Sequence, residues 1–334
     1  MNKATLVVGP FYQNNKIFDL NDKIVNRDNC MYPFFLLKSE FEKAEINLAT
    51  QDINPISESQ NVIYNEMPKN LPQGKEIEKS YLLIFESELI RPDNWDLKKH
   101  RYFKKIFTWN DNYVDNKKYF KMNFSQKIPE SLNMQTKDKL CTLIAGNKMN
   151  QDKRELYSER LKAIKWFEKN HPGDFDLYGM GWDKLFLKIP FNYFNRLDMC
   201  KSIAVKFRPS FKGVVQSKND VYSRYKFAIC FENVKDIPGY ITEKIFDCFF
   251  AGCVPVYWGA SNIQEFVPKE CFIDKRNFSS YEDLYGFIYN IDENIYFNYI
   301  NAIESYLQGK EIKLFSAEYF SKTIFNNIIG SKSA

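Results

Sequence analysis

Three residues of different chemistry stand together where an apolar run gives way to a predicted helix. Thr242, Glu243 and Lys244 come after the run Phe227–Phe231 and a loop. Backbone N–H groups at a helix N-terminus are unpaired, and the helix dipole there favours anions. With Lys244 adding charge and Glu243 able to accept hydrogen bonds from a ribose diol, the pattern suits a nucleoside diphosphate. Spacing alone fits an ordinary capped helix with a solvated lysine at least as well.

A second candidate is a carboxylate at the end of the apolar run Tyr81–Phe85. Glu86 follows this run directly, and a strand buried on both faces of a parallel sheet shows such a continuous run. Folds of this kind bind ligands in the crevice beyond the carboxyl ends of their strands. A carboxylate there could take the proton of an attacking hydroxyl. Glu88, two residues further on, competes for the same role.

Metal chemistry has little support in the sequence. Asp174 and Asp176 mimic the acidic pair of metal-dependent transferases, but they stand at the start of a predicted strand, where a structural role is the better interpretation. The two histidines, His100 and His171, are too few and too far apart for a metal site. We therefore predict no metal site.

The elements that must position these residues alternate between strands and helices. In the first half, the predicted strands are Leu6–Gly9, Ile46–Leu48, Tyr81–Phe85 and Ile106–Trp109, with a helix at Tyr32–Lys43. In the second half, they are Leu140–Ala145, Phe175–Gly179, Phe227–Phe231 and Val254–Gly259, with helices at Glu155–Asn170 and Thr242–Ala251. Gly252 is expected to close the second of these helices in a left-handed cap. The alternation predicts an α/β architecture.

The length of 334 residues favours two domains. A polar stretch from Gln126 to Lys139 is the predicted linker. We expect domains at 1–130 and 140–310, and a C-terminal helical segment at 311–334. Apolar residues of that segment recur at helical spacing, so it is expected to pack back across the cleft onto the first domain.

The composition excludes several classes of protein. Hydrophobic residues make up 44% and charged residues 27% of the chain, which excludes a wholly disordered protein. No apolar run reaches the roughly 18 residues of a membrane helix. No export signal is recognisable, and nothing resembles a nucleic-acid-binding motif. The seven cysteines show no metal-like pairing and most lie in apolar runs, as free thiols do in the cytoplasm, so we expect a cytoplasmic protein.

One dense basic run contains Lys98, Lys99, His100, Arg101, Lys104 and Lys105. A solvated helix face or loop is the ordinary interpretation. The alternative is attraction to an anionic inner membrane surface, where each basic residue contributes about 1 kcal/mol.

The stretch Tyr225–Gly259 reads YKFAICFENVKDIPGYITEKIFDCFFAGCVPVYWG. It resembles the donor-binding signature of glycosyltransferase family 10, the α-1,3/4-fucosyltransferases. The shared skeleton is Lys-Phe, Phe-Glu-Asn, Tyr-x-Thr-Glu-Lys and Pro-Val-x-x-Gly, in that order. Similarity to the family's donor domain extends from Leu140 to about Asp274, whereas the N-terminal half is less similar.

The resemblance implies two Rossmann-like domains facing a cleft, the arrangement called GT-B. It implies an inverting transfer of L-fucose from GDP-fucose to a hydroxyl, expected to be O3 of an N-acetylglucosamine-containing or related glycan. A bacterial member would build surface polysaccharide or lipopolysaccharide, with a glycan or lipid-linked oligosaccharide as acceptor. Another GDP- or UDP-sugar as donor is the alternative, and a non-catalytic carbohydrate-binding protein a more distant one. No cofactor is implied, because cationic side chains take the place of a metal.

The resemblance also assigns roles to individual residues. Ile84-Phe85-Glu86-Ser87 is similar to the family's Phe-Glu-Ser segment, whose glutamate is the catalytic base. The family often continues with Pro, where this chain has Glu88, so Glu88 stays a competitor. Arg160 is similar to the diphosphate-binding arginine, with Arg154 as the alternative. The other implied donor-binding residues are Asn233, Tyr240, Thr242, Glu243 and Lys244.

Overall fold

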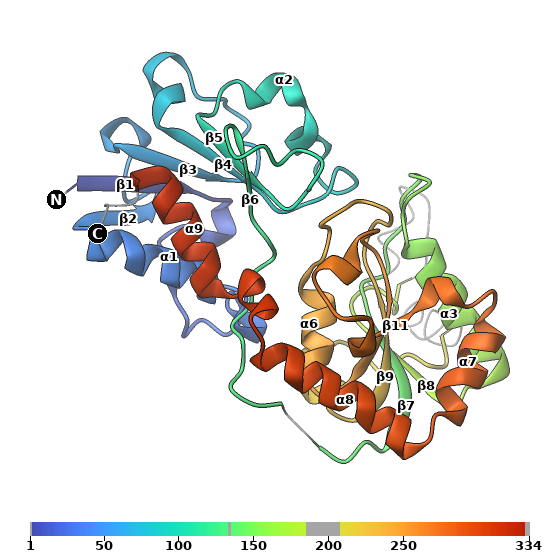
Figure 1. Ribbon diagram of the computed structural model, residues 1–334. Helices are drawn as coiled ribbons and strands as arrows, with labels where there is room; N and C mark the ends of the chain where they lie inside the picture. The colour runs from blue at the N-terminus through green and yellow to red at the C-terminus, as the bar shows by residue number, and fades with distance from the viewer. Residues whose placement is uncertain (1, 133–134, 185–207, 331–334) are drawn as a thin grey trace.

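The computed structural model describes residues 2–132, 135–184 and 208–330. Two parallel sheets, one in each half of the chain, form the centres of two domains that lie side by side (Figure 1). In each domain, helices alternate with the strands along the chain and pack on the sheet. Apolar residues of the helices and of the sheet are therefore buried between these layers.

The N-terminal sheet has six parallel strands in the order β2-β1-β3-β4-β5-β6. Their bounds are β1 Asn2–Val7, β2 Ile46–Thr50, β3 Asn61–Asn65, β4 Ser80–Ile84, β5 Lys105–Thr108 and β6 Tyr119–Lys121. Every residue of the central strand β4 is buried, which explains its continuous apolar run. Helix α1 (Tyr32–Lys43) packs beside this sheet, and the short α2 (Leu97–His100) precedes β5.

The C-terminal sheet has five parallel strands in the order β11-β10-β9-β7-β8. The strands are β7 Lys139–Ile144, β8 Phe175–Tyr178, β9 Tyr225–Phe231, β10 Val254–Trp258 and β11 Ile273–Asp274. The helices among the described residues of this domain are α3 Tyr157–Asn170, α5 Lys218–Tyr222, α6 Glu243–Phe250, α7 Tyr281–Asn290 and α8 Glu293–Gln308. Helix α6 lies on the side of the sheet nearer the N-terminal domain, and α3 and α7 lie on the far side (Figure 1).

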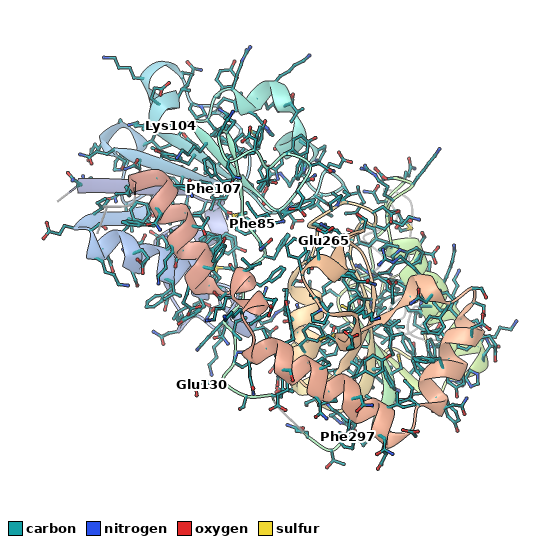
Figure 2. The ribbon with its side chains drawn as sticks, viewed as in Figure 1. Phe85, Lys104, Phe107, Glu130, Glu265 and Phe297 are labelled. Atoms are coloured by element: carbon teal, nitrogen blue, oxygen red, sulfur yellow. The ribbon has the colours of Figure 1, made fainter. Side chains whose placement is uncertain are left out.

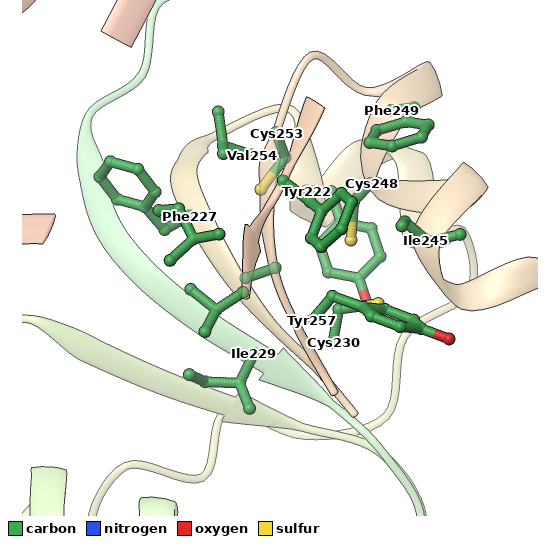
Figure 3. Close-up of a cluster of buried hydrophobic side chains, with 14 of the residues drawn as sticks. Tyr222, Phe227, Ile229, Cys230, Ile245, Cys248, Phe249, Cys253, Val254 and Tyr257 are labelled. Carbon is green, nitrogen blue, oxygen red and sulfur yellow. The ribbon is translucent and has the colours of Figure 1, made fainter. Parts of the chain in front are cut away.

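The core of the C-terminal domain explains why α6 sits where it does. Ile245, Cys248 and Phe249 of α6 are fully buried against β9 and β10, as Figure 3 shows. Gly252 has φ +59 and its N–H bonds to the carbonyl of Phe249, which confirms the predicted left-handed cap. The C-terminal end of the helix therefore lies in the core of its own domain.

Two chain segments connect the domains. The first runs from β6 to β7, and the second is the 3₁₀ turn Glu311–Phe315, which leads into α9 (Ala317–Ile329). Gln126 joins them, because its N–H bonds to Phe315 O (2.7 Å) and its carbonyl accepts from Ala317 N (2.9 Å). Helix α9 packs on α1, with the rings of Phe325 and Phe41 5.3 Å apart. The C-terminal helix thus belongs to the core of the N-terminal domain.

All eight predicted strands are present, but β1 was placed wrongly. It begins at Asn2 and ends at Val7, so Val8 and Gly9 lie beyond it. Strands β6 and β11 were not predicted, because they have only three and two residues and lie at sheet edges. Strand β3 was also missed, although it has five residues and lies inside the sheet. The predicted class, two Rossmann-like α/β domains, is confirmed.

Candidate functional site

A cavity of about 320 Å³ lies between the two domains. The predicted residues that line it are Glu86, Arg160, Asn233, Tyr240, Thr242, Glu243 and Lys244. A second cavity of about 380 Å³ is lined mainly by the N-terminal domain and shares Glu86, Phe124 and Glu243 with the first. Glu86 therefore stands where two adjoining cavities meet. A larger apolar hollow of about 680 Å³ between β11, α7 and α8 is lined by none of these residues.

Glu232, at the end of β9, holds the first turn of α6 in place. Its side chain is fully buried and accepts hydrogen bonds from Thr242 N (2.8 Å) and Thr242 Oγ1 (2.7 Å). Gly259 is required beside it, because a Cβ there would come within 2.5 Å of Glu232 Cγ. Glu232 is the glutamate of the Phe-Glu-Asn motif, for which the sequence predicted no individual role. The structure makes it the anchor of the β9–α6 connection.

Lys244 is held at the cavity by the same carboxylate. Its Nζ lies 3.2 Å from Glu232 Oε2 and donates to Thr242 Oγ1 (2.9 Å). Burial lowers the pKa of Lys244, but the neighbouring Glu232 and Glu243 outweigh it and the net shift is upward. The lysine is therefore charged at all physiological pH values. Thr242 itself is only 2% exposed, so it supports Lys244 and presents little surface to a ligand.

Arg160 is a buried cation with neutral partners. Its side chain projects from α3, and its Nη2 donates to Phe231 O (2.5 Å) and to Asn233 Oδ1 (3.1 Å). Among residues 2–132, 135–184 and 208–330, no carboxylate forms an ion pair with it. Burial lowers its pKa, but an arginine keeps its charge in proteins. Asn233 thus orients a guanidinium that lines the cavity and has spare N–H donors.

The charged residues of the cavity are mostly basic. Five basic side chains line it, namely Arg27, Lys148, Arg160, Lys218 and Lys244, against three acidic ones, Glu86, Glu243 and Asp247. This excess favours an anionic ligand. Lys218 is neutralised by Asp247 (2.6 Å) and also lies 3.6 Å from Glu243. Burial raises the pKa of Glu243, but the attraction of Lys244 and Lys218 lowers it by more. The net shift is downward, so the carboxylate is ionised.

Glu86 follows β4, and its backbone is fixed on both sides. Its carbonyl accepts from Trp95 Nε1 (3.0 Å), and the carbonyl of Phe85 accepts from Trp109 Nε1 (2.7 Å). The amides of both residues donate to Glu66 Oε1, each at 3.0 Å. Burial raises the pKa of Glu86, an effect that Lys244 and Lys148 partly offset. A raised pKa makes this carboxylate a stronger base than an exposed one.

Glu66, which was not among the predicted site residues, lines the second cavity together with Glu86. Burial raises its pKa to about 7 despite the hydrogen bonds from Glu86 N, Asn94 and Phe85 N. Its sequence signal was the run Val62-Ile63-Tyr64, whose β-branched and aromatic residues are typical of a strand. Had β3 been recognised, Glu66 would have appeared at a carboxyl strand end, as Glu86 did.

The two competing candidates, Glu88 and Arg154, contact each other instead of the cavity. Arg154 Nη2 pairs with Glu88 Oε1 across the domain boundary, and with Asp152 Oδ2 at 2.7 Å. Neither residue lines either of the two adjoining cavities. Their charges neutralise each other, which favours Glu86 and Arg160 for the chemistry.

Tyr240 lies in a tight contact between the domains. Its ring packs on Trp109 of the N-terminal domain with centroids 4.5 Å apart, and it is only 1% exposed. The preceding Gly239 has φ +81, and a Cβ there would meet Trp109 O at 2.2 Å. The loop therefore needs glycine to approach the other domain so closely. Tyr240 touches the cavity mainly as part of its wall.

The residues considered for metal binding have structural partners. Asp176 pairs with Lys139 and with Lys212 (3.3 Å), and Asp174 accepts from Tyr285 Oη (2.8 Å). His171 stacks on Tyr285. Within the described part of the chain, no cluster of three or more His, Cys, Asp or Glu side chains could hold a metal ion.

The basic run at α2 is partly buried. His100 is 2% exposed and contacts Tyr119 Oη (3.0 Å) and Asn94 O (2.7 Å), whereas Lys98, Arg101 and Lys104 are exposed. Over the ranges that the structure covers, no helix combines the length and apolar character needed to cross a membrane. Of the cysteines, five are buried free thiols, Cys30 is exposed, and Cys200 lies outside the described residues.

Comparison with known families identifies the C-terminal domain. Residues 191–320 match the family described as Glycosyltransferase family 10 (fucosyltransferase) C-term. The alpha-(1,3)-fucosyltransferase FucT of Helicobacter pylori is 32% identical over 124 residues, which are 34% of this chain and 25% of that protein. The alpha-(1,4)-fucosyltransferase of Arabidopsis thaliana is 39% identical over 72 residues, 22% of this chain and 18% of that protein. The matched sequence thus spans a quarter or less of these relatives. The predicted resemblance to family 10 is confirmed over this domain.

The whole fold is similar to solved glycosyltransferase structures. An alpha1,3-fucosyltransferase with GDP-fucose has a TM-score of 0.54 at 14% identity, over 100% of this chain and 91% of that chain. An alpha-glucosyltransferase in complex with UDP and a 13-mer DNA has a TM-score of 0.58 at 10% identity, over 98% of this chain and 100% of that one. At these identities the likeness concerns the fold, and it confirms the predicted GT-B arrangement.

Proposed function

We propose that this protein is an inverting fucosyltransferase, which transfers L-fucose from GDP-fucose to a hydroxyl group of a glycan. The observation that carries the proposal is Arg160, a buried guanidinium that lines the interdomain cavity, donates to two neutral oxygens and forms no ion pair with a carboxylate of the described residues. A buried charge is costly unless an opposite charge compensates it. The diphosphate of a nucleotide sugar would supply that charge, and the similarity of this domain to fucosyltransferases supports GDP-fucose as the donor.

The catalytic base in this proposal is Glu86. Its carboxylate takes the proton from the acceptor hydroxyl, whose oxygen then attacks the anomeric carbon of fucose. The bond from that carbon to the phosphate oxygen breaks, and GDP leaves with the electron pair. Attack from the face opposite the leaving group inverts the anomeric configuration. The position of Glu86 at the junction of the two cavities supports this role, because the donor would occupy one cavity and the acceptor the other.

The donor-domain residues divide into two groups in this proposal. Arg160, Lys244 and the N-terminus of α6 stabilise the negative charge that develops on the diphosphate. Asn233 and Thr242 hold Arg160 and Lys244 in place, as their hydrogen bonds indicate. Glu243, at the start of α6, is the proposed acceptor of the ribose hydroxyls. Because these cations carry the leaving-group charge, we propose that no metal or other cofactor is required.

The proposed acceptor is an N-acetylglucosamine-containing or related glycan, with O3 as the attacking hydroxyl. A lipid-linked oligosaccharide or lipopolysaccharide precursor in the cytoplasm fits the exposed basic residues Lys98, Arg101 and Lys104, which would attract the protein to an anionic inner membrane surface. We propose no role in nucleic-acid binding.

A donor screen tests the proposal directly. GDP or UDP release is measured with GDP-fucose, GDP-mannose and UDP-sugars, each with and without N-acetyllactosamine. Among these donors, we expect only GDP-fucose to give turnover that depends on the acceptor. NMR of the product should identify the new linkage as α-1,3. Turnover with GDP-mannose or a UDP-sugar but not with GDP-fucose would replace the proposed donor. Binding of GDP without any turnover would instead indicate a non-catalytic binding protein.

A further inference from the structure

Glu66 adopts a backbone conformation that a charged residue seldom has. It follows β3 directly, its φ is +76, and its N–H bonds to the carbonyl of Leu83 (3.0 Å) on the neighbouring strand β4. Glycine or asparagine usually occupies this region of φ, because other side chains crowd the backbone there. Glu45 also has a positive φ, +60, so the case for a required carboxylate at position 66 rests on its hydrogen bonds.

Both oxygens of that carboxylate accept hydrogen bonds from N–H donors. Oε1 accepts from the amides of Phe85 and Glu86, each at 3.0 Å, and Oε2 accepts from Asn94 Nδ2. Asn94 is fully buried and cannot turn its amide round, because its Oδ1 already accepts from Met67 N (2.8 Å). Three fixed donors therefore surround Glu66, an arrangement that only two acceptor oxygens can satisfy.

These bonds act on the residue proposed as the base. With Glu66 on the amides and Trp95 and Trp109 on the carbonyls, the backbone of Phe85 and Glu86 is held at four points. Phe85 lies on the side of the N-terminal domain that faces the C-terminal domain (Figure 2). These contacts set the direction in which the Glu86 side chain projects from the backbone, and hence its place at the cavity junction.

We propose that Glu66 is a positioning residue for Glu86, whose carboxylate fixes the end of β4 so that Glu86 meets the acceptor hydroxyl. The proposal rests on the proposed role of Glu86 as the base. The charged groups around Glu66 are Glu86, which repels it, and Arg91, which attracts it. Glu66 holds the backbone and does not touch the reacting atoms.

A reversal of hydrogen-bond polarity gives a sharp test. In Glu66→Gln, the amide oxygen can still serve Phe85 N and Glu86 N, but its NH₂ group faces Asn94 Nδ2, so two donors meet. In Asn94→Asp, two carboxylates meet. In the double variant, the new amide at position 66 would donate to the new carboxylate at position 94, which would still accept from Met67 N. Every bond is then satisfied again, although the charge has moved from position 66 to position 94.

We expect each single variant to lower kcat with GDP-fucose at least tenfold at pH 8, with GDP affinity within twofold of wild type. The kcat of the double variant should be within about threefold of the wild-type kcat. Wild-type kcat in both single variants would overturn the proposal. Equal losses of kcat and GDP affinity would do so too, as would a folded double variant as slow as the singles. If Glu66→Gln does not fold, Glu66→Gly takes its place, since glycine tolerates φ +76 and removes only the anchor.

Amide hydrogen exchange at Phe85 and Glu86 tests the hydrogen bonds of these two amides to Glu66 independently of turnover. We expect exchange at these amides to be at least tenfold faster in Glu66→Gly than in wild type. In the double variant of Glu66→Gln with Asn94→Asp, the exchange rate should equal that of wild type. Unchanged exchange in Glu66→Gly would overturn the positioning role. A wild-type protein that transfers no fucose but shows this exchange pattern would contradict only the proposed function.

Discussion

Arg154 of the C-terminal domain forms an ion pair with Glu88 of the N-terminal domain. The pair joins the two domains beside the interdomain cavity without lining it. Arg154 also pairs with Asp152, and its carbonyl accepts from Lys235 N (2.9 Å), so the arginine is held from several sides. The two residues that competed with Glu86 and Arg160 in the sequence thus have a shared structural role.

Replacing Glu86 by Gln should lower kcat about 10²- to 10⁴-fold, because the amide keeps the shape of the side chain but cannot accept a proton. GDP affinity, measured by calorimetry, should change less than twofold. Glu88→Gln is the matched control, since it loses only a half-exposed ion pair and should stay within about threefold of wild type. A large loss in Glu88→Gln with near-normal Glu86→Gln would transfer the role of base to Glu88.

Replacing Arg160 by Ala should weaken GDP binding by about 1.5–3 kcal/mol, the contribution of a hydrogen bond to a charged group. Lys244→Ala is a less clean test, because it also leaves the buried Glu232 without its cationic partner. Arg154→Ala is the better control and should leave GDP affinity within twofold. If calorimetry shows equal GDP affinity for Arg160→Ala and wild type, Arg160 does not contact the diphosphate.

Fucosyl transfer should continue in excess EDTA, because Arg160, Lys244 and the N-terminus of α6 carry the charge of the leaving diphosphate. The measurement is the rate of GDP release before and after EDTA, followed by addition of manganese. Loss of turnover with EDTA and recovery with manganese would contradict the proposal that no metal is needed.

Stability should depend on pH through Glu66, whose pKa is raised from 4.5 to about 7 by burial. The folded protein then binds a proton more tightly than the unfolded chain, so this contribution is complete below pH 4.5 and is lost as the pH rises through 7. The free energy of unfolding of wild type, relative to Glu66→Gln, should fall by about 3 kcal/mol between about pH 4.5 and 8. Urea titrations of both proteins at several pH values measure the difference. A constant or rising difference would show that the pKa of Glu66 is not raised.

Much of the fold was predictable because its signals are local. The buried run at Tyr81–Ile84 and the helix at Tyr32–Lys43 follow from hydrophobic pattern alone, and the structure has that helix at the same bounds. The signature from Tyr225 to Gly259 carried the donor-domain resemblance, since Glu232, Thr242 and Lys244 lie within one β9–α6 unit. A strand joined to its next helix by a short loop brings such residues together without help from the rest of the chain.

Pairings between distant segments were decided only by the tertiary structure. Glu66 reaches Glu86 because β3 and β4 are neighbours in the sheet, with Asn65 beside Leu83. Arg154 reaches Glu88 because the domains meet at that boundary. The sequence by itself determined the segments and the chemistry that they carry. Which carboxylate faces the cavity and which is neutralised depends on strand order and domain contact, and these arise from packing of surfaces far apart in the chain, which no local pattern encodes.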